Sequence, residues 1–210
     1  MAITTLNNLS INRSDTAAAD QVWTATSATA SDFQAAAGGA WTFIKSQTAT
    51  SAASVDWVNG TSDVVFDSTY IAYQLWAFSV VGATDTAVIR MLYSNDTGGS
   101  YETSGYKIRT IFSGGGVSAG AQTAEALYIS NTGTTAGERC SFVYDFYNPA
   151  QTADFARGTW RTSYTDASSD IYSGTGATSY ASTGAIDAFR IIMSTGNITG
   201  TFKLYGLSGS

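Results

Sequence analysis

The chain has no histidine among its 210 residues, and it has one cysteine, Cys140. A Ser-His-Asp triad needs an imidazole to take the proton from the serine hydroxyl, so that class of hydrolase is excluded. A single cysteine also excludes a disulfide within the chain. Zinc, copper and non-haem iron sites draw mainly on histidine and cysteine, so we expect no such metal and no cofactor.

Charged residues are also scarce, at 12% of the chain, and sixteen Asp and Glu outnumber ten Lys and Arg. No basic run is present to neutralise phosphates, so we expect no nucleic-acid partner. The longest apolar stretch, residues 70–81, is too short to span a bilayer, so we expect no membrane partner. Residues 1–6 have neither the basic nor the apolar region of a signal peptide, which argues against export by that route.

Proline is nearly absent, with Pro149 alone, and glycine is left to form the turns. From Trp41 onward, short segments rich in β-branched and aromatic residues alternate with turn clusters. No segment of twelve or more residues shows the periodicity of an amphipathic helix, which argues against crossover helices and a parallel sheet. We therefore predict an all-β fold, an antiparallel β-sandwich that is jelly-roll-like. The predicted strands are 41–46, 54–58, 63–66, 70–81, 86–94, 105–112, 124–130, 139–147, 158–164, 188–194 and 200–206.

Strict alternation of apolar and polar residues is clearest in three of these segments and predicts which side chains are buried. Cys140 belongs to one of them, so we expect its thiol in the core. The predicted core faces are Ala87, Ile89, Met91 and Tyr93; Cys140, Phe142, Tyr144 and Phe146; and Phe189, Ile191 and Met193.

Residues 1–40 differ from the rest, being rich in Ala, Ser, Thr and Asn with weak periodicity. We interpret them as an N-terminal arm or loosely packed edge, with one short helical turn after Ser31-Asp32. The predicted organisation is an arm over 1–40 and a β-sandwich domain over 41–210.

Residues 116–120, Gly-Val-Ser-Ala-Gly, match the G-x-S-x-G nucleophile elbow around Ser118. With no histidine, the remaining bases are lysines, and Lys45, Lys107 and Lys203 all fall in strand patterns where we expect them to face solvent. The elbow also requires a following helix, which three consecutive glycines at 114–116 disfavour. We therefore predict a flexible loop here, without a nucleophile.

Carboxylates leave one enzyme class open, because a glycosidase needs only two of them at a suitable separation. Glu125, Glu138, Asp145 and Asp154 are the candidates. Asp145 lies between Tyr144 and Phe146, so we expect it on the outer face of a strand as an ordinary exposed residue. We predict that the chain is not an enzyme.

Oxygen-ligand cations such as calcium are the remaining metal class. The candidates are Asp96 in SNDTGGS and the stretch from Asp56 through Asp63 to Asp67, but neither matches the EF-hand loop. Asp and Asn commonly cap turns through bonds to the backbone, and we expect that role for both stretches.

Aromatic residues are abundant, with five Trp, twelve Tyr and ten Phe. Exposed Trp and Tyr on a β-sandwich can stack on sugar rings, and Trp, Tyr and Arg also concentrate binding energy at protein interfaces. The segment WRTSY at 160–164 has this mixture, so Trp160, Arg161 and Tyr164 are the candidate ligand or interface residues.

Two longer stretches have a recognisable sequence pattern. Residues 70–106 combine apolar strands with the S-x-D-x-G-G turn at 94–99, and residues 188–207 end in I-T-G-T-F-K-L-Y-G-L. Together they resemble a class of tailed-bacteriophage virion proteins, the head-decorating or fibre-like β-sandwich modules. We expect the turn to close a long hairpin, and the last strand to place Phe202 and Leu204 on one face and Tyr205 on the other.

The resemblance implies a structural virion protein that decorates or cements the outer capsid shell through contacts with the major capsid protein or other virion proteins. It would be made in the host bacterial cytoplasm, lie on the capsid surface, and form a small homo-oligomer, with a trimer favoured. The alternative is a fibre or spike module that binds host surface glycans.

Overall fold

The computed structural model describes residues 21–25, 31–35, 40–113, 116–118 and 124–209. The chain divides into two compact units, residues 1–40 and 41–210. In the first unit, β1 (Gln21–Ala25) pairs antiparallel with β2 (Ser31–Ala35), and Trp23 lies opposite Phe33. The helical turn predicted after Ser31 is therefore wrong: residues 31–35 pair as a strand with a segment whose Val, Trp and Thr favour the β conformation.

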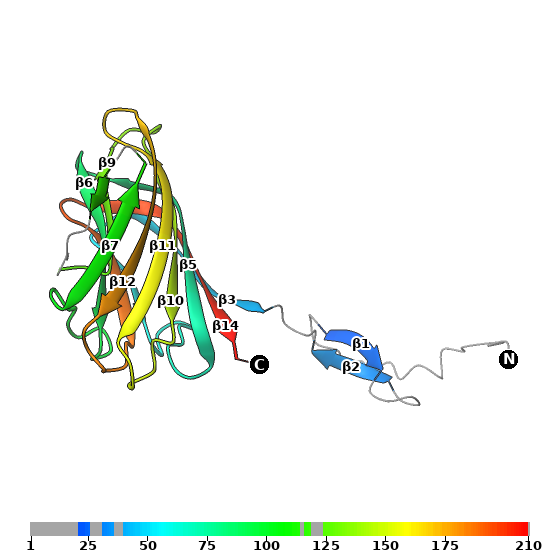
Figure 1. Cartoon of the computed structure of the whole chain (residues 1–210). Helices are drawn as coiled ribbons and strands as arrows, with labels where there is room; N and C mark the ends of the chain where they lie inside the picture. The colour runs from blue at the N-terminus through cyan, green and yellow to red at the C-terminus, as the bar shows by residue number, and fades with distance from the viewer. Residues whose placement is uncertain (1–20, 26–30, 36–39, 114–115, 119–123, 210) are drawn as a thin grey trace, which may run out of the picture. The chain divides into compact units, whose positions relative to one another are not determined.

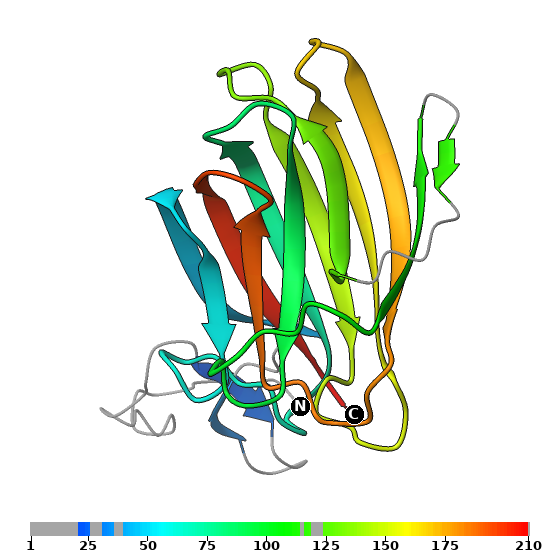
Figure 2. The same cartoon turned by 90° about the vertical axis from the view of Figure 1, so that its left-hand side faces the viewer.

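The second unit is an antiparallel β-sandwich, which confirms the predicted fold class. Its large sheet has eight strands in the order β3-β14-β5-β10-β11-β12-β7-β8 (Figure 1), and its small sheet has four in the order β4-β13-β6-β9, which face the viewer in Figure 2. The strands are β3 (Trp41–Ala52), β4 (Val55–Val58), β5 (Tyr70–Gly82), β6 (Ala87–Ser94), β7 (Tyr106–Phe112), β8 (Gly116–Ser118), β9 (Leu127–Thr132), β10 (Cys140–Tyr147), β11 (Ala156–Thr165), β12 (Ile171–Tyr180), β13 (Ala188–Met193) and β14 (Ile198–Ser208).

The core lies between the two sheets and contains the side chains that alternation predicts. All of the predicted inward residues of β6, β10 and β13 are buried, including Cys140. Phe202 and Leu204 of β14 are buried as well, while Tyr205 faces outward and is half-buried, as predicted. The hydroxyl groups of Tyr93 and Tyr144 hydrogen-bond to each other inside this core, so two phenols from opposite sheets satisfy one another.

Successive strands mostly belong to different sheets. The turn at 94–100 leads from β6 in the small sheet to β7 in the large sheet, so the prediction that it closes a hairpin is wrong. The turn at 194–197 likewise joins β13 to β14 across the sandwich. Within the large sheet, only β7 with β8 and the run β10-β11-β12 pair with their neighbours in sequence.

Two further elements differ from the sequence predictions. Residues 63–66 form a loop, not a strand, although Val64 and Phe66 still reach the core; the amide of Phe66 donates to Asn59 Oδ1 at 2.8 Å and holds that loop in place. The strand β12 is absent from the predicted set, since Gly174 and Gly176 interrupt its apolar alternation.

Candidate functional site

The structure describes residues 116–118 of the elbow sequence, which include Ser118. Residues 116–118 form β8, a short strand paired with β7 so that Ser118 lies opposite Thr110. The loop predicted at this serine is thus a strand. A nucleophile elbow places its serine at a sharp turn between a strand and a helix, whereas Ser118 belongs to the strand β8.

The four carboxylates considered as candidate glycosidase residues lie in different environments. Glu125 is almost fully buried 3.9 Å from Arg90 Nε, and burial raises its pKa. The carboxylate of Glu138 accepts the amides of Thr134 and Thr135, and these bonds lower its pKa. The other two, Asp145 and Asp154, lie respectively on the outer face of β10 and in the exposed loop after it.

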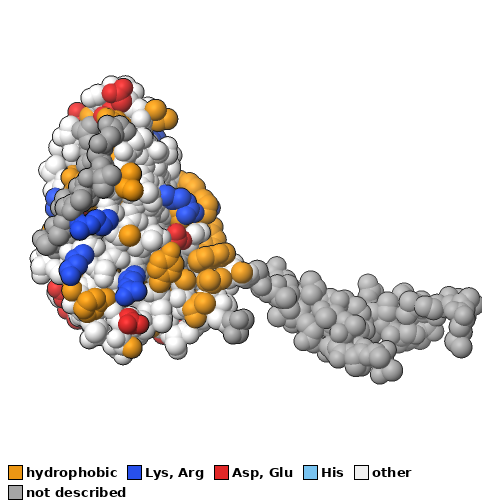
Figure 3. Space-filling view, viewed as in Figure 1, with side chains coloured by type: hydrophobic (Ala, Val, Ile, Leu, Met, Phe, Trp, Pro, Cys, Tyr) orange, Lys and Arg blue, Asp and Glu red, His pale blue; other side chains and the backbone are white. Residues whose placement is uncertain are grey.

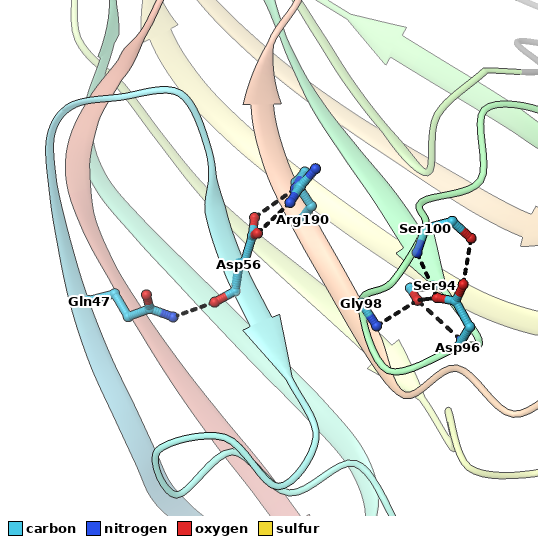
Figure 4. A network of polar contacts seen from close by, with 7 residues as sticks. All are labelled: Gln47, Asp56, Ser94, Asp96, Gly98, Ser100 and Arg190. Carbon is cyan, nitrogen blue, oxygen red and sulfur yellow. Dashed lines mark hydrogen bonds and ion pairs between the residues drawn. The ribbon is translucent and has the colours of Figure 1, made fainter.

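Asp96 caps its own turn, as expected. Its Oδ1 accepts the Ser94 hydroxyl at 2.7 Å and the Ser100 amide at 2.8 Å, and its Oδ2 accepts the Ser100 hydroxyl at 2.6 Å (Figure 4). These bonds, chiefly those from Ser100, lower the pKa of Asp96 to about 2. Both carboxylate oxygens are therefore engaged by the turn itself.

The second candidate cation stretch is also used structurally. Asp56 forms a bidentate pair with Arg190 of the adjacent strand, with Nε to Oδ1 at 2.8 Å and Nη2 to Oδ2 at 2.6 Å (Figure 4). Asp67 Oδ1 accepts the amide of Thr69 at 2.7 Å. Across the described residues, no three Asp, Glu or Cys side chains converge in a way that would hold a metal ion.

The candidate ligand residues at 160–164 are only partly placed as predicted. Trp160 is 1% exposed and Tyr164 is 4% exposed, because both point into the core from β11. The prediction that they form an exposed aromatic site is wrong, since alternation puts the two aromatic residues on the inward face and Arg161 on the outward one. Arg161 alone of the three reaches the outer surface of the large sheet.

The exposed aromatic residues lie elsewhere on that same outer face. We call this group the aromatic surface; Figure 3 shows apolar side chains gathered where β3, β14 and β5 lie. The rings of Trp76 and Phe78 stack with centroids 6.0 Å apart, and those of Phe43 and Tyr205 meet edge to face at 5.5 Å. The aromatic surface consists of Trp41 and Phe43 of β3, Trp76 and Phe78 of β5, and Tyr205 of β14.

Trp76 and Phe78 form a ridge between two shallow hollows, because both residues line each one. The first hollow, of about 280 Å³, continues across β10 and β11 to Val143 and Arg161. The second, of about 360 Å³, extends across β14 to Trp41 and Tyr205. A ridge of flat rings with a depression on either side offers stacking area to an extended ligand or to side chains of another protein.

A chain of polar contacts fixes the ridge. Trp76 Nε1 donates to Gln74 Oε1 at 2.6 Å, and Gln74 Nε2 donates to Asp145 Oδ1 at 2.6 Å. Asp145 Oδ2 lies 3.6 Å from Arg161 Nη1. The indole is thus held in one orientation by side chains from two neighbouring strands, and Arg161 extends the polar row to a third. This arrangement reduces the entropy that a ligand must remove on binding.

Positive charge is concentrated in the large sheet. Its strands contain six of the ten Lys and Arg but one of the sixteen Asp and Glu, Asp145, in a chain of formal net charge −6. The basic residues are Lys45, Lys107, Arg109, Arg157, Arg161 and Lys203.

The sequence contains a weak signal for the aromatic surface, and it lies in β5 rather than at 160–164. Alternate residues of β5 belong to opposite faces, so Tyr73 is buried while Gln74 and Trp76 lie together on the outer face. Both faces of β5 are largely apolar, so the sequence of this strand does not show which face is buried and which is exposed. The polar residues Gln74 and Lys203, which interrupt the aromatic residues on one face, indicate which face meets solvent.

The chain matches no known family model, and no curated protein matches it in sequence. Within the described residues, the chain forms no helix with the length and hydrophobicity that a membrane crossing requires.

Proposed function

We propose that this chain is a non-catalytic structural protein of a tailed-phage virion, which decorates or cements the capsid shell through protein–protein contacts. The observation that carries the proposal is the edge strand β3, which has twelve residues and lies at the end of the large sheet, paired with β14 on one side. Long edge strands offer a row of backbone donors and acceptors to another chain.

The side chains of β3 suit such pairing. Proline, which would block the ladder, does not occur in it, and Lys45 is its single charge. Natural proteins protect free edges with several charges or prolines, and β3 has few of these devices. Trp41 and Phe43 extend the aromatic surface to this edge, so strand addition would bury both backbone and aromatic area. The expected partners are further copies of the chain, with a trimer favoured, and the major capsid protein.

The test is the oligomeric state of the purified full chain, measured by light scattering and sedimentation, together with rebinding to capsid shells stripped of it. The variant Thr42→Lys/Ser46→Lys adds charge to the edge at two exposed positions. Ser173→Lys/Thr175→Lys adds the same charge to exposed positions of the interior strand β12 and serves as the control. We expect the edge variant alone to lose self-association and shell binding. If the wild-type chain is monomeric and does not bind to the stripped capsid shells, the proposal is excluded.

The fixed orientation of Trp76 favours a second candidate, a fibre or spike module that binds host surface glycans. A sugar ring stacks best on an indole that is already held flat and exposed, and Gln74, Asp145 and Arg161 supply hydrogen-bonding groups beside it. Trp76→Leu should abolish glycan binding and leave oligomerisation unchanged. A glycan array that gives no signal with the wild-type chain would count against this candidate and leave the first one standing.

A further inference from the structure

A second group of residues on the outer face of the large sheet forms what we call the cationic hollow. It has a volume of about 390 Å³ and lies over β7, β12 and β11. Three basic side chains and two small ones shape it: Lys107, Arg109, Arg157, Ala177 and Ser179.

The strand register explains the hollow. Ser179 of β12 lies opposite Arg157 on one side and opposite Lys107 on the other, and Ala177 lies opposite Arg109. Residues directly opposite one another on adjacent strands point to the same face of the sheet. The long basic side chains therefore stand around a floor of small residues, which leaves room for a group to approach between them.

The residues lining the hollow include no carboxylate. Asp145, the one acidic residue in the strands of the large sheet, pairs instead with Arg161. Lys107 and Arg157 carry like charges on the two strands that flank Ser179, and a bound anion would reduce the repulsion between them. The cationic hollow is thus electrostatically complementary to a carboxylate or sulfate group.

We propose that the outer face of the large sheet binds an acidic polysaccharide, with its acid groups in the cationic hollow and its sugar rings on Trp76 and Phe78. This inference deepens the glycan-binding candidate and rests on it. Four strand intervals separate β5 from β7, which corresponds to ~19 Å across the strands, and Lys107 lies four residues, ~13 Å, along β7 from Ile111 of the Trp76 row. The distance suits an oligosaccharide segment, not a single sugar.

The residues between the two sites favour a glycan over an acidic protein. From Trp76 the row runs through Val143 and Arg161 to Thr175, and the next row toward the cationic hollow contains Asp145, Thr159 and Ala177. Thr159, Thr175 and the ion pair of Arg161 with Asp145 provide hydrogen-bonding groups along the path. The core of a protein interface is usually depleted of charge and rich in large apolar side chains. A nucleic acid would need closely spaced cations along its whole backbone, whereas here three cations gather over β7, β12 and β11 and a single one, Arg161 or Lys203, lies in each hollow beside the aromatic ridge.

The experiment measures binding of the purified full chain to polygalacturonate, to the same polymer fully methyl-esterified, and to single-stranded DNA of similar charge. Esterification removes the charge and keeps the rings. The test variant is Lys107→Gln/Arg157→Gln, both at exposed positions, and Arg139→Gln, exposed and outside the strands, is the control. We expect the wild-type chain to prefer the acidic polymer, the test variant to lose about tenfold or more in affinity, and the control to be unchanged.

Each other outcome contradicts the inference in a distinct way. Equal binding of the acidic and esterified polymers, lost in Trp76→Leu but not in the double variant, would overturn the acidic preference and keep the glycan-binding function. Binding of DNA as tight as that of polygalacturonate would show a general polyanion surface. Absence of binding to either sugar polymer, while an array of neutral glycans gives signal, would again overturn the inference alone.

Discussion

Gly176 lies directly opposite Trp160 in the pairing of β12 with β11, and the indole ring of Trp160 lies over the glycine where a side chain would begin. A methyl group at this position would overlap the ring. Trp160 is fully buried, so it has little freedom to move aside. We predict that Gly176→Ala lowers the free energy of unfolding by about 1–3 kcal/mol, as measured by urea denaturation.

The matched control for that substitution is Gly137→Ala. Gly137 lies in the turn before β10, and no atom lies within 4 Å of the position that a methyl group would take. This change should alter the stability by less than about 0.5 kcal/mol. If both variants unfold at the same urea concentration as the wild-type chain, the packing of Trp160 on β12 is not as described.

The same contact shows why part of the fold could not be predicted. Alternation identifies β6, β10 and β13 because their inward residues are large and apolar. β12 has Gly174 and Gly176 at inward positions, since Phe112 and Trp160 of the adjacent strands fill the space above them. Its sequence thus looks like a loop, and its pairing depends on side chains from other strands.

Cys140 should be unreactive in the folded protein. Its side chain is fully buried, and burial raises the pKa of the thiol to about 12, so the reactive thiolate is absent at neutral pH. We predict no labelling by Ellman's reagent in the native chain and complete labelling in denaturant. Native labelling as fast as that of the denatured chain would mean that Cys140 is exposed.

Asp96 should make stability depend on acid pH. Its pKa is about 2 in the folded chain, below the ordinary value of 3.8, so the ionised carboxylate stabilises the turn at neutral pH. This contribution is present above the ordinary pKa and is lost as the pH falls through about 2. We expect Asp96→Asn to be less stable than the wild-type chain at pH 7 and equal to it below pH 2, by thermal unfolding at a series of pH values.

Asp85→Asn is the control for Asp96, because it removes an equal charge from another exposed loop, the one between β5 and β6. Asp85→Asn should lower the stability at pH 7 by less than Asp96→Asn does, which separates the loss of the capping bonds from the loss of one negative charge. A constant difference for Asp96→Asn between pH 4 and pH 2 would contradict the capping role.

The ion pair of Asp56 and Arg190 should contribute more than that of Asp145 and Arg161. The first is bidentate, and Arg190 also lies 4.0 Å from the centre of the Tyr101 ring. The second is longer, at 3.6 Å, and Arg161 is 61% exposed. Double-mutant cycles with alanine should give a coupling energy of about 1 kcal/mol for the first pair and less than about 0.5 kcal/mol for the second. Equal couplings would show that the geometry of the first pair adds nothing.

The candidate site was harder to predict than the fold. The abundance of aromatic residues correctly suggested an exposed aromatic surface, but the segment that it pointed to, 160–164, lies on a strand in the middle of the large sheet whose aromatic residues face inward. The surface instead consists of residues from β3, β5 and β14, which lie far apart in the sequence. Only their pairing in three dimensions brings Trp41, Trp76 and Tyr205 onto one face.

The position of β14 between β3 and β5 has a consequence for how the protein is made. During translation, β3 and β5 leave the ribosome long before β14, the strand that lies between them. The eight-stranded sheet therefore cannot be complete until residue 208 has been synthesised. Until then, the edges of β3 and β5 that pair with β14 in the finished sheet are free to pair with other nascent chains. The complete sandwich can therefore form only after β14 has been synthesised, and a pause between the synthesis of β5 and that of β14 should favour misassembly over the native sandwich.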